Sequence, residues 1–221
     1  MRKVIIKPLE KEYITIIIHA TDLEEPFPFK NTKLQEEKSF EFGDITHTVI
    51  LNMLFSKDKW KYAYAFYSTD MSPEQKKLVM TRVSKSSSLP ELLLIEQKKR
   101  VIIEFWKYMI ILASKLDGIY INWEEMTIVD VKTSKYKWDI NEAEWKMQMK
   151  IYAFVHQIPN IEWWIYTKVN PELQRMNFKL DIESNKQEVL NKIINHMEVK
   201  YGYNPLQFKQ SEYENSSKNT D

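Results

Sequence analysis

The segment that decides the fold is Ile128-Val129-Asp130-Val131-Lys132-Thr133-Ser134. Its β-branched residues favour a strand, and side chains alternate between the two faces of a strand. Asp130 and Lys132 therefore project from one face, while Val129 and Val131 project from the other. A carboxylate and an amine about 6–7 Å apart along one face suit two cooperating roles, which are holding a divalent cation and orienting a water or a phosphate. Taken alone, an Asp-x-Lys pair is more often a solvated salt bridge.

A second carboxylate lies just upstream, at Asp117. Leu116–Ile121 and Met126–Lys132 are predicted strands, and residues 122–125 form the turn that joins them as a hairpin. Asp117 and Asp130 have similar separations from this turn, so we expect their side chains to meet. Two carboxylates at about 4 Å repel each other, and a bound cation relieves that repulsion.

Two predicted helices flank this hairpin. Asn141–Gln157 has an apolar stripe at helical spacing, and Gln148 and Tyr152 lie one turn apart on a neighbouring flank, where ordinary packing is the simplest interpretation. The apolar spacing from Asp44 to Leu54 predicts the other helix, with Asp44 as its N-cap. This helix carries His47, for which a position at the edge of the core or on the surface is the plain alternative.

Together these segments resemble the PD-(D/E)XK nuclease superfamily, and in particular its RecB-like exonuclease branch. The resemblance is carried by four ordered elements, namely Gly43 to His47, Leu116 to Ile119, Ile128 to Ser134 and Gln148 to Tyr152. It covers about residues 40–168. Ser114 and Leu116 depart from the residues that this branch often has before its first aspartate. The absence of cysteine excludes the iron–sulfur cluster of some relatives.

The resemblance implies a restriction-endonuclease-like α/β core, with a central mixed β-sheet flanked by helices, and a metal-dependent deoxyribonuclease. It implies that His47, Asp117, Asp130 and the Val131 carbonyl bind Mg²⁺ or Mn²⁺. It further implies that Lys132 places the attacking water and that Gln148 and Tyr152 support the site. The residues implied to act in catalysis are Asp117, Asp130, Lys132, Gln148 and Tyr152.

Charge indicates how a substrate would be held. The chain has 221 residues and a net charge of +1, so DNA, single- or double-stranded, needs a local basic surface. Lys115, Lys135 and Lys146 are the candidates, although a solvated charged face is the alternative for each. Oligomeric state is left open, with a homo-oligomer as one alternative.

The remaining pattern bears on location and organisation. No apolar run is long enough for a signal peptide or a membrane helix, so we expect a soluble intracellular protein of the cytoplasm or a host-cell cytoplasm with no membrane partner. Residues 1–203 are predicted to form one nuclease domain, with residues 204–221 as a disordered tail. Residues 21–42 are predicted to form a loop, residues 84–88 a linker, and residues 72–83 and 186–201 helices.

Two other functions compete with a nuclease. One is a non-catalytic nucleic-acid-binding or scaffold protein on the same fold; its disadvantage is that a retired site has no chemical reason to keep Asp117, Asp130 and Lys132 together. The other is a different α/β enzyme. The chain has no glycine-rich phosphate loop, no Gly-x-Ser-x-Gly and no His-Glu-x-x-His to support one.

Overall fold

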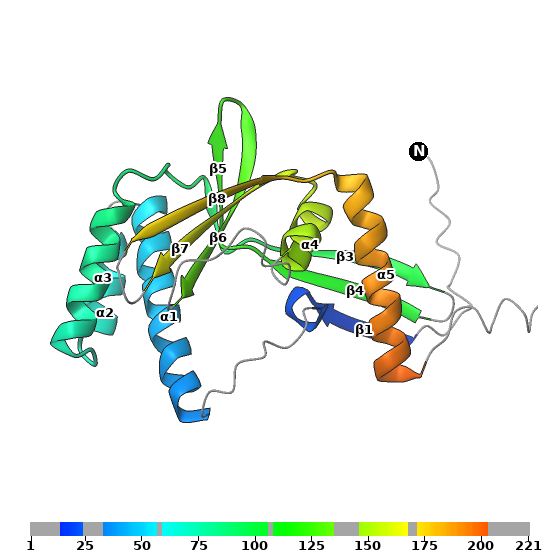
Figure 1. The fold of residues 1–221 in the computed structure, drawn as a ribbon, viewed down its shortest axis with the longest axis horizontal. Helices are drawn as coiled ribbons and strands as arrows, with labels where there is room; N and C mark the ends of the chain where they lie inside the picture. Colours follow the sequence, from blue (N-terminus) through cyan, green and yellow to red (C-terminus); the bar gives the residue numbers. More distant parts are fainter. Residues whose placement is uncertain are drawn as a thin grey trace, which may run out of the picture.

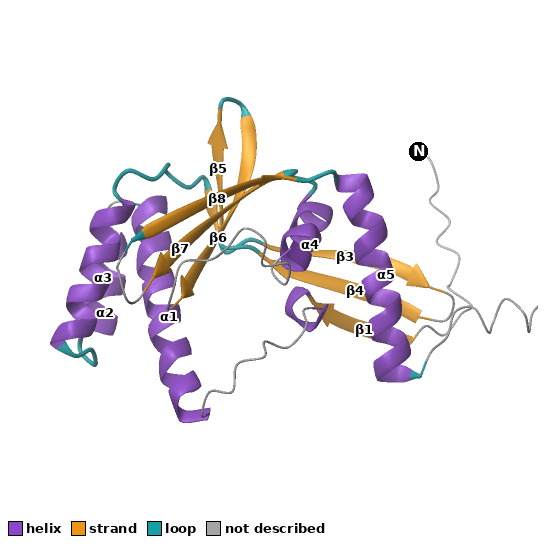
Figure 2. Cartoon of the chain, in the orientation of Figure 1, coloured by secondary structure: helices purple, strands orange, loops and turns teal. Residues whose placement is uncertain are grey.

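The computed structural model describes residues 14–23, 33–56, 59–105, 108–134, 146–167 and 172–202, without the side chains of residues 33–41, 105 and 146. These residues form two β-sheets with α-helices packed against them (Figures 1 and 2). Both sheets contain parallel and antiparallel pairs. The predicted α/β class is therefore confirmed, with the difference that the strands divide between two sheets.

The first sheet has three strands. Its central strand is β4 (Tyr108–Lys115), which pairs in parallel with β1 (Ile14–His19) and antiparallel with β3 (Lys98–Phe105). A 3₁₀ turn, η1 (Ala20–Leu23), follows β1 and supplies two buried apolar side chains.

The second sheet has five strands in the order β2-β5-β6-β7-β8, and it carries the segment that opened the sequence analysis. Its strands are β2 (Leu94–Ile95), β5 (Gly118–Asn122), β6 (Glu125–Ser134), β7 (Asn160–Thr167) and β8 (Leu173–Lys179). The predicted hairpin is present as β5 and β6. Trp123 and Glu124 form its turn with φ of 49° and 71°, the left-handed geometry that two-residue hairpin turns need.

The two sheets join at a seam. The chain leaves β4 at Lys115 and enters β5 at Gly118, so Leu116 and Asp117 lie between strands of different sheets. Here Leu116 N–H donates to the Gln97 carbonyl at 3.0 Å, and Glu96 N–H donates to the Asp117 carbonyl at 2.8 Å. These bonds continue the pairing from one sheet to the other and fix the backbone of Asp117.

Helices enclose the second sheet from two sides. α4 (Lys146–His156) and α5 (Ile182–Tyr201) pack on apolar side chains of both sheets, including Ile128 of β6. α1 (Lys33–Phe55) packs Ile50 and Leu51 against Val129 on the other face of β6. α2 (Lys59–Ser68) and α3 (Pro73–Ser86) pack against α1 (Figure 1).

Two helices end in well-formed caps. Ser72 caps α3, with its hydroxyl accepting from Gln75 N–H while the Gln75 side chain accepts from Ser72 N–H. Gly202, at φ 64°, ends α5 in the left-handed conformation that glycine adopts readily.

Three predictions about the N-terminal half are wrong. α1 begins at Lys33, so Asp44 lies inside the helix instead of capping it. For the same reason the loop predicted over residues 21–42 cannot extend beyond residue 32. Leu34, Gln35 and the glutamates after them are good helix formers, and this propensity extends the helix beyond its apolar pattern. The predicted linker at residues 84–88 is largely helix, because α3 continues to Ser86.

α2 was not predicted. None of its described side chains is fully buried, and the residues that pack inward, Trp60, Ala63, Tyr64 and Tyr67, are mostly aromatic. Aromatic residues have only moderate helix propensity, so the local signal for a helix is weak. No helix among the described residues is long and apolar enough to cross a membrane. The predicted tail at 204–221 lies outside the described residues, and the single-domain division stays a prediction.

Candidate active site

Strand β6 presents its side chains as the alternation predicts. Val129 and Val131 are buried in the cluster beneath α1, whereas Asp130 and Lys132 face the side covered by α4. Lys132 Nζ lies 2.8 Å from Asp130 Oδ2, at ion-pair distance although without the direction of a good hydrogen bond. The Asp130 side chain is only 2% exposed, so this carboxylate is held away from water.

Asp117 reaches the same place from the seam. The antiparallel register pairs Gly118 with Val129, and continuing it by one residue sets Asp117 opposite Asp130. Asp117 Oδ2 accepts a 2.7 Å hydrogen bond from Val131 N–H. The carboxylate thus takes the place of a strand partner for β6, which ties its position to that strand.

His47 comes from α1, more than 60 positions away in the sequence. Its Nε2 lies 2.9 Å from Asp117 Oδ1. One turn earlier is Gly43, where an added Cβ would lie 3.0 Å from Thr133 Oγ1 of β6. A residue without a side chain therefore lets α1 approach β6 closely enough for His47 to reach the carboxylate.

α4 adds a chain of polar contacts. Lys132 Nζ donates to Gln148 Oε1 at 2.9 Å, and Gln148 Nε2 donates to the Tyr152 hydroxyl at 2.6 Å. Gln148 and Tyr152 are 6% and 3% exposed, and both lie one turn apart on the helix. The Lys132 ammonium is therefore positioned by a carboxylate on its own strand and by an amide on the helix.

Burial and charge shift the acidity of these groups in opposite directions. Burial, together with the charge of Asp117, raises the pKa of Asp130 to about 6, although Lys132 opposes the shift. Burial alone would raise the pKa of Asp117, but His47, Lys132 and the Val131 N–H lower it overall. Burial alone would lower the pKa of His47, but Asp117 raises it overall. One carboxylate is strongly acidic and its neighbour is weakly acidic, as expected for two negative charges sharing one site.

The donor set fits a hard divalent cation. The buried Asp130 carboxylate, the partly buried Asp117 carboxylate and an imidazole are ligands that Mg²⁺ and Mn²⁺ accept. A cation would offset both the burial of charge and the repulsion that raise the pKa of Asp130. Within the part of the chain that is described, no three acidic or imidazole groups stand ready as a complete cage. Instead His47 is bonded to Asp117 and Lys132 to Asp130, so cation binding would replace contacts among the ligands themselves.

The predicted residues are not all placed together. The structure brings together His47, Asp117, Asp130, Val131, Lys132, Gln148 and Tyr152, and Val131 does so through its N–H. Lys115 is exposed and bonded to Glu96 Oε1 at 2.6 Å. Lys135 and the Lys146 side chain lie outside the described residues. The roles of all these residues stay predictions.

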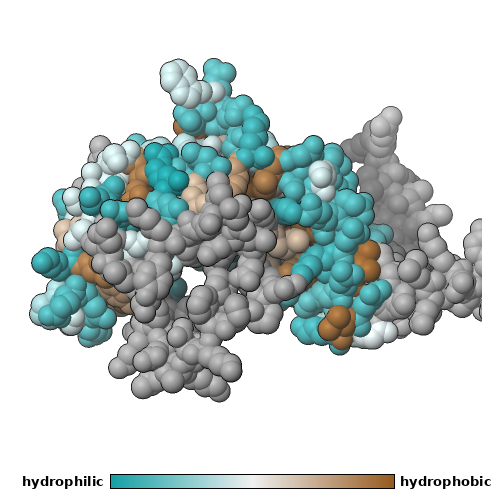
Figure 3. All heavy atoms as spheres, in the orientation of Figure 1, coloured by the Kyte–Doolittle hydropathy of each residue, from teal (hydrophilic) through white to brown (hydrophobic). Residues whose placement is uncertain are grey.

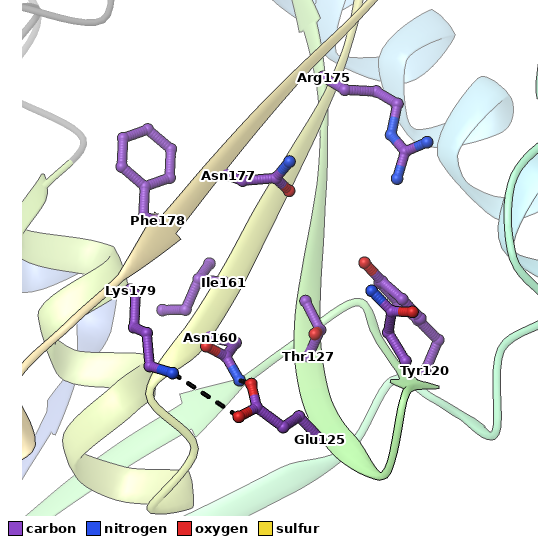
Figure 4. A pocket seen from close by; sticks show the side chains of 10 residues that line it. Tyr120, Glu125, Thr127, Asn160, Ile161, Arg175, Asn177, Phe178 and Lys179 are labelled. Carbon is purple, nitrogen blue, oxygen red and sulfur yellow. Dashed lines mark hydrogen bonds and ion pairs between the residues drawn. The ribbon is translucent and has the colours of Figure 1, made fainter.

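A second buried polar group was missed in the sequence. Glu162 of β7 is fully buried, accepts a hydrogen bond from the Tyr120 hydroxyl at 2.7 Å and forms an ion pair with Arg175 of β8. Beside it lies a cavity of about 360 Å³, lined mostly by polar side chains of β5 to β8 together with Ile161 and Phe178, in which Lys179 and Glu125 are 3.6 Å apart (Figure 4). In the sequence, the buried Glu162 is indicated only by its place as one acidic residue in an otherwise apolar strand, Ile161-Glu162-Trp163-Trp164.

No protein-family model and no curated protein matches the chain. Among solved structures, it is similar to SSO0001, with 14% identity, a TM-score of 0.43, and 80% of this chain and 75% of that chain covered. It is also similar to a phage-related exonuclease from Haemophilus somnus, with 12% identity, a TM-score of 0.31 and coverage of 89% and 96%.

A third similar structure is an alkaline exonuclease from Laribacter hongkongensis, with 12% identity and a TM-score of 0.29. The similarity covers 52% of this chain and 64% of that exonuclease, so this chain spans less than two thirds of its length. At this level of similarity the relationship to the PD-(D/E)XK superfamily stays a prediction. These likenesses are distant, and what the chain binds or cleaves has to be argued from the geometry of the site.

Proposed function

We propose that this protein is a divalent-metal-dependent nuclease that hydrolyses phosphodiester bonds of DNA, in replication, recombination or repair, including that of a virus or a mobile element. The observation that carries the proposal is the unbroken set of contacts from His47 through Asp117 to β6, and from Asp130 through Lys132 to Gln148. A structural salt bridge would need two of these groups. Five groups from four separate segments converge here, among them the buried Asp130 carboxylate and the partly buried Asp117 carboxylate.

Each group has a role that its contacts support. Asp117, Asp130 and His47 would hold Mg²⁺ or Mn²⁺, with the Val131 carbonyl as a further ligand. The metal, when bound, lowers the pKa of a coordinated water and offsets charge on the scissile phosphate. Lys132, held between Asp130 and Gln148, would orient the attacking water and stabilise negative charge on the phosphate oxygens.

Gln148 and Tyr152 would act as positioning residues. The Gln148 amide fixes Lys132 through its oxygen and is itself fixed through its nitrogen by the Tyr152 hydroxyl. Because both residues are buried on α4, the amine is restrained in a site that excludes most water. Preorganised charge in such a site costs little reorganisation when the reaction occurs.

Substrate would be held by cations outside the buried site. Lys115 lies two residues before Asp117, and Lys98 and Lys99 lie on the adjacent strand β3. All three lysines are exposed. Lys135 and Lys146 are included on their position in the sequence. Contacts to phosphates give binding that weakens with salt and is independent of base sequence.

The test measures cleavage and metal binding separately. End-labelled single- and double-stranded DNA is incubated with Mg²⁺, Mn²⁺ or EDTA, and Mn²⁺ binding is followed by calorimetry. We expect EDTA to stop cleavage, and Asp130→Asn to lose both cleavage and Mn²⁺ binding. We expect Lys132→Met to lose cleavage while keeping metal binding. Asp70→Asn, at an exposed position, is the matched control and should behave like the wild type.

The non-catalytic alternative has a distinct outcome. A scaffold protein on this fold would bind DNA and leave it intact with either metal, and its DNA affinity would not change in Asp130→Asn. Cleavage that survives in a clean Asp130→Asn, Lys132→Met double variant would place the activity elsewhere and reject this site.

A further inference from the structure

One face of the three-stranded sheet is uncovered by any described helix. Residues of β1, β4 and β3 alternate, and the set that includes Ile16, Ile110 and Leu112 points into the core with α4 and α5. The opposite set includes Ile17, Ile111 and Ile102, which form one row across the three strands because Ile111 pairs with both of the others. This outer face is defined by the rows centred on Ile111.

The isoleucine row is exposed to an unusual degree. Ile17 is 52% exposed and Ile102 is 61% exposed, while Ile111 between them is partly covered by its neighbours. On the side of the molecule shown in Figure 3, by contrast, apolar side chains over α5 appear as separate spots among hydrophilic ones. A contiguous apolar row on a flat sheet is typical of a surface that binds another protein surface.

The charges on either side of this row are opposite in sign. One step along β3 from Ile102 on the same face is Arg100, in the row with Ala113 and His19. One step in the other direction is Glu104, in the row with Met109. Each charged row lies about 7 Å from the isoleucine row, given two residues of strand rise.

We propose that this outer face binds the same face of a second copy of the chain. A two-fold axis along the isoleucine row, across the strands, would lay β3 over β3 in the opposite direction. Arg100 would then face Glu104 of the partner subunit twice, and the isoleucines would pack at the centre. Such self-complementarity is what an isologous dimer requires, and two sheets pack face to face at about 10 Å, within reach of these side chains.

The size of the face sets the strength of the dimer. Three strands of about eight residues cover roughly 14 by 26 Å, which is roughly half of the 800 Å² per partner that a stable interface buries. The dimer is therefore a weak one that forms as concentration rises. Lys98 and Lys115, which the proposed function assigns to DNA, form the row beyond Arg100 and lie outside the three rows that the two-fold axis pairs. Within those three rows a nucleic acid would be attracted to Arg100 but repelled by Glu104, and an apolar row offers nothing to phosphates, so a second copy fits them better.

The experiment measures mass against concentration by sedimentation velocity on the full chain. We expect wild-type protein to shift from monomer towards dimer, and Ile102→Asp to stay monomeric. Val199→Asp is the matched control, because Val199 is 90% exposed on α5 away from this face, and it should dimerise like the wild type. A wild-type protein that stays monomeric throughout, or an Ile102→Asp variant that dimerises normally, overturns the proposal.

A charge exchange tests the geometry itself. Arg100→Glu puts two like charges against each other at two symmetric places, so we expect dimerisation to weaken roughly tenfold or more. Adding Glu104→Arg to that variant restores the pairing in the opposite sense and should recover the wild-type dimer. If Arg100→Glu instead reduces DNA binding, leaves dimerisation unchanged and is not corrected by Glu104→Arg, the face is a phosphate contact and the dimer proposal is refuted.

Discussion

Replacing Asp130 by asparagine should stabilise the metal-free protein while removing its proposed activity. The wild-type carboxyl has its pKa raised from 3.8 to about 6 by burial and by Asp117. Keeping it ionised in the fold at pH 8 therefore costs about 3 kcal/mol, since about two pKa units at 1.36 kcal/mol each separate the folded and unfolded states. Asparagine has the same shape without the charge and avoids this cost.

The direction of the Asp130 pKa shift determines the pH range over which the stability of the fold changes. A carboxyl whose folded pKa is raised stabilises the fold below about pH 3.8, where it is protonated in both states, and this stability is lost as pH rises through about 6. The variant and the wild type should therefore have similar stability near pH 4, and the advantage of Asp130→Asn should grow to its full value above pH 6.

The assay is thermal unfolding in EDTA, monitored by circular dichroism at several pH values. For a chain of this size about 3 kcal/mol corresponds to a rise in Tm of roughly 6–12 °C at pH 8. Adding Mn²⁺ should raise the Tm of the wild type, because a ligand that binds only the native state stabilises it, and should leave Asp130→Asn unchanged.

One result would refute the reasoning. If the Asp130–Lys132 pair were a structural salt bridge, removing its carboxylate would leave the Lys132 ammonium with the neutral Gln148 amide but without its negative partner, and would lower the Tm at pH 8. A variant less stable than the wild type in EDTA would therefore mean that this site is not under the charge repulsion described. Asp70→Asn, which is exposed, should show no change in either direction.

Three further changes test the surroundings of the site. Gln148→Met removes the side chain that accepts a hydrogen bond from the Lys132 ammonium, and such a charged hydrogen bond is worth about 1.5–3 kcal/mol. The value of kcat should therefore fall roughly 10- to 150-fold with little change in metal binding. A single-turnover assay measures this fall, with Gln187→Met at an exposed position as the control. Glu162→Gln weakens the ion pair between the buried Glu162 and the half-exposed Arg175 and should lower the Tm without changing specific activity per folded molecule. Unchanged stability would contradict a structural role. Burial, and to a smaller extent Lys99, lower the pKa of His156 to about 4. The neutral ring therefore stabilises the fold above about pH 6.5, and that contribution is lost as pH falls towards 4. His156→Asn should flatten the decline of Tm over this pH range.

Much of the second sheet could be predicted because its signals are local. Alternation placed Asp130 and Lys132 on one face of β6, and the turn at residues 122–125 gave a register that brings Asp117 opposite Asp130. These inferences need only the period of a strand and the geometry of a hairpin.

The rest depends on contacts that no local pattern encodes. The division into two sheets follows from the chain crossing at Leu116 and Asp117, and nothing in those residues distinguishes a seam from a continuous strand. The bond from Val131 N–H to Asp117 and the buried role of Glu162 likewise arise from tertiary packing. The approach of His47 could be expected from the family resemblance alone, since α1 and the seam are far apart in the sequence.

Because of the seam, the backbones of Asp117 and Asp130 are held by different sheets. Asp130 belongs wholly to the five-stranded sheet, whereas the backbone of Asp117 is the crossing point to the three-stranded one. The Val131 N–H holds the Asp117 carboxylate to β6, so a small change in the angle between the sheets would strain the backbone of Asp117 and reach the proposed metal site through that hydrogen bond. A molecule or another subunit bound to the three-stranded sheet would in this way affect the proposed hydrolysis without contacting a reacting atom.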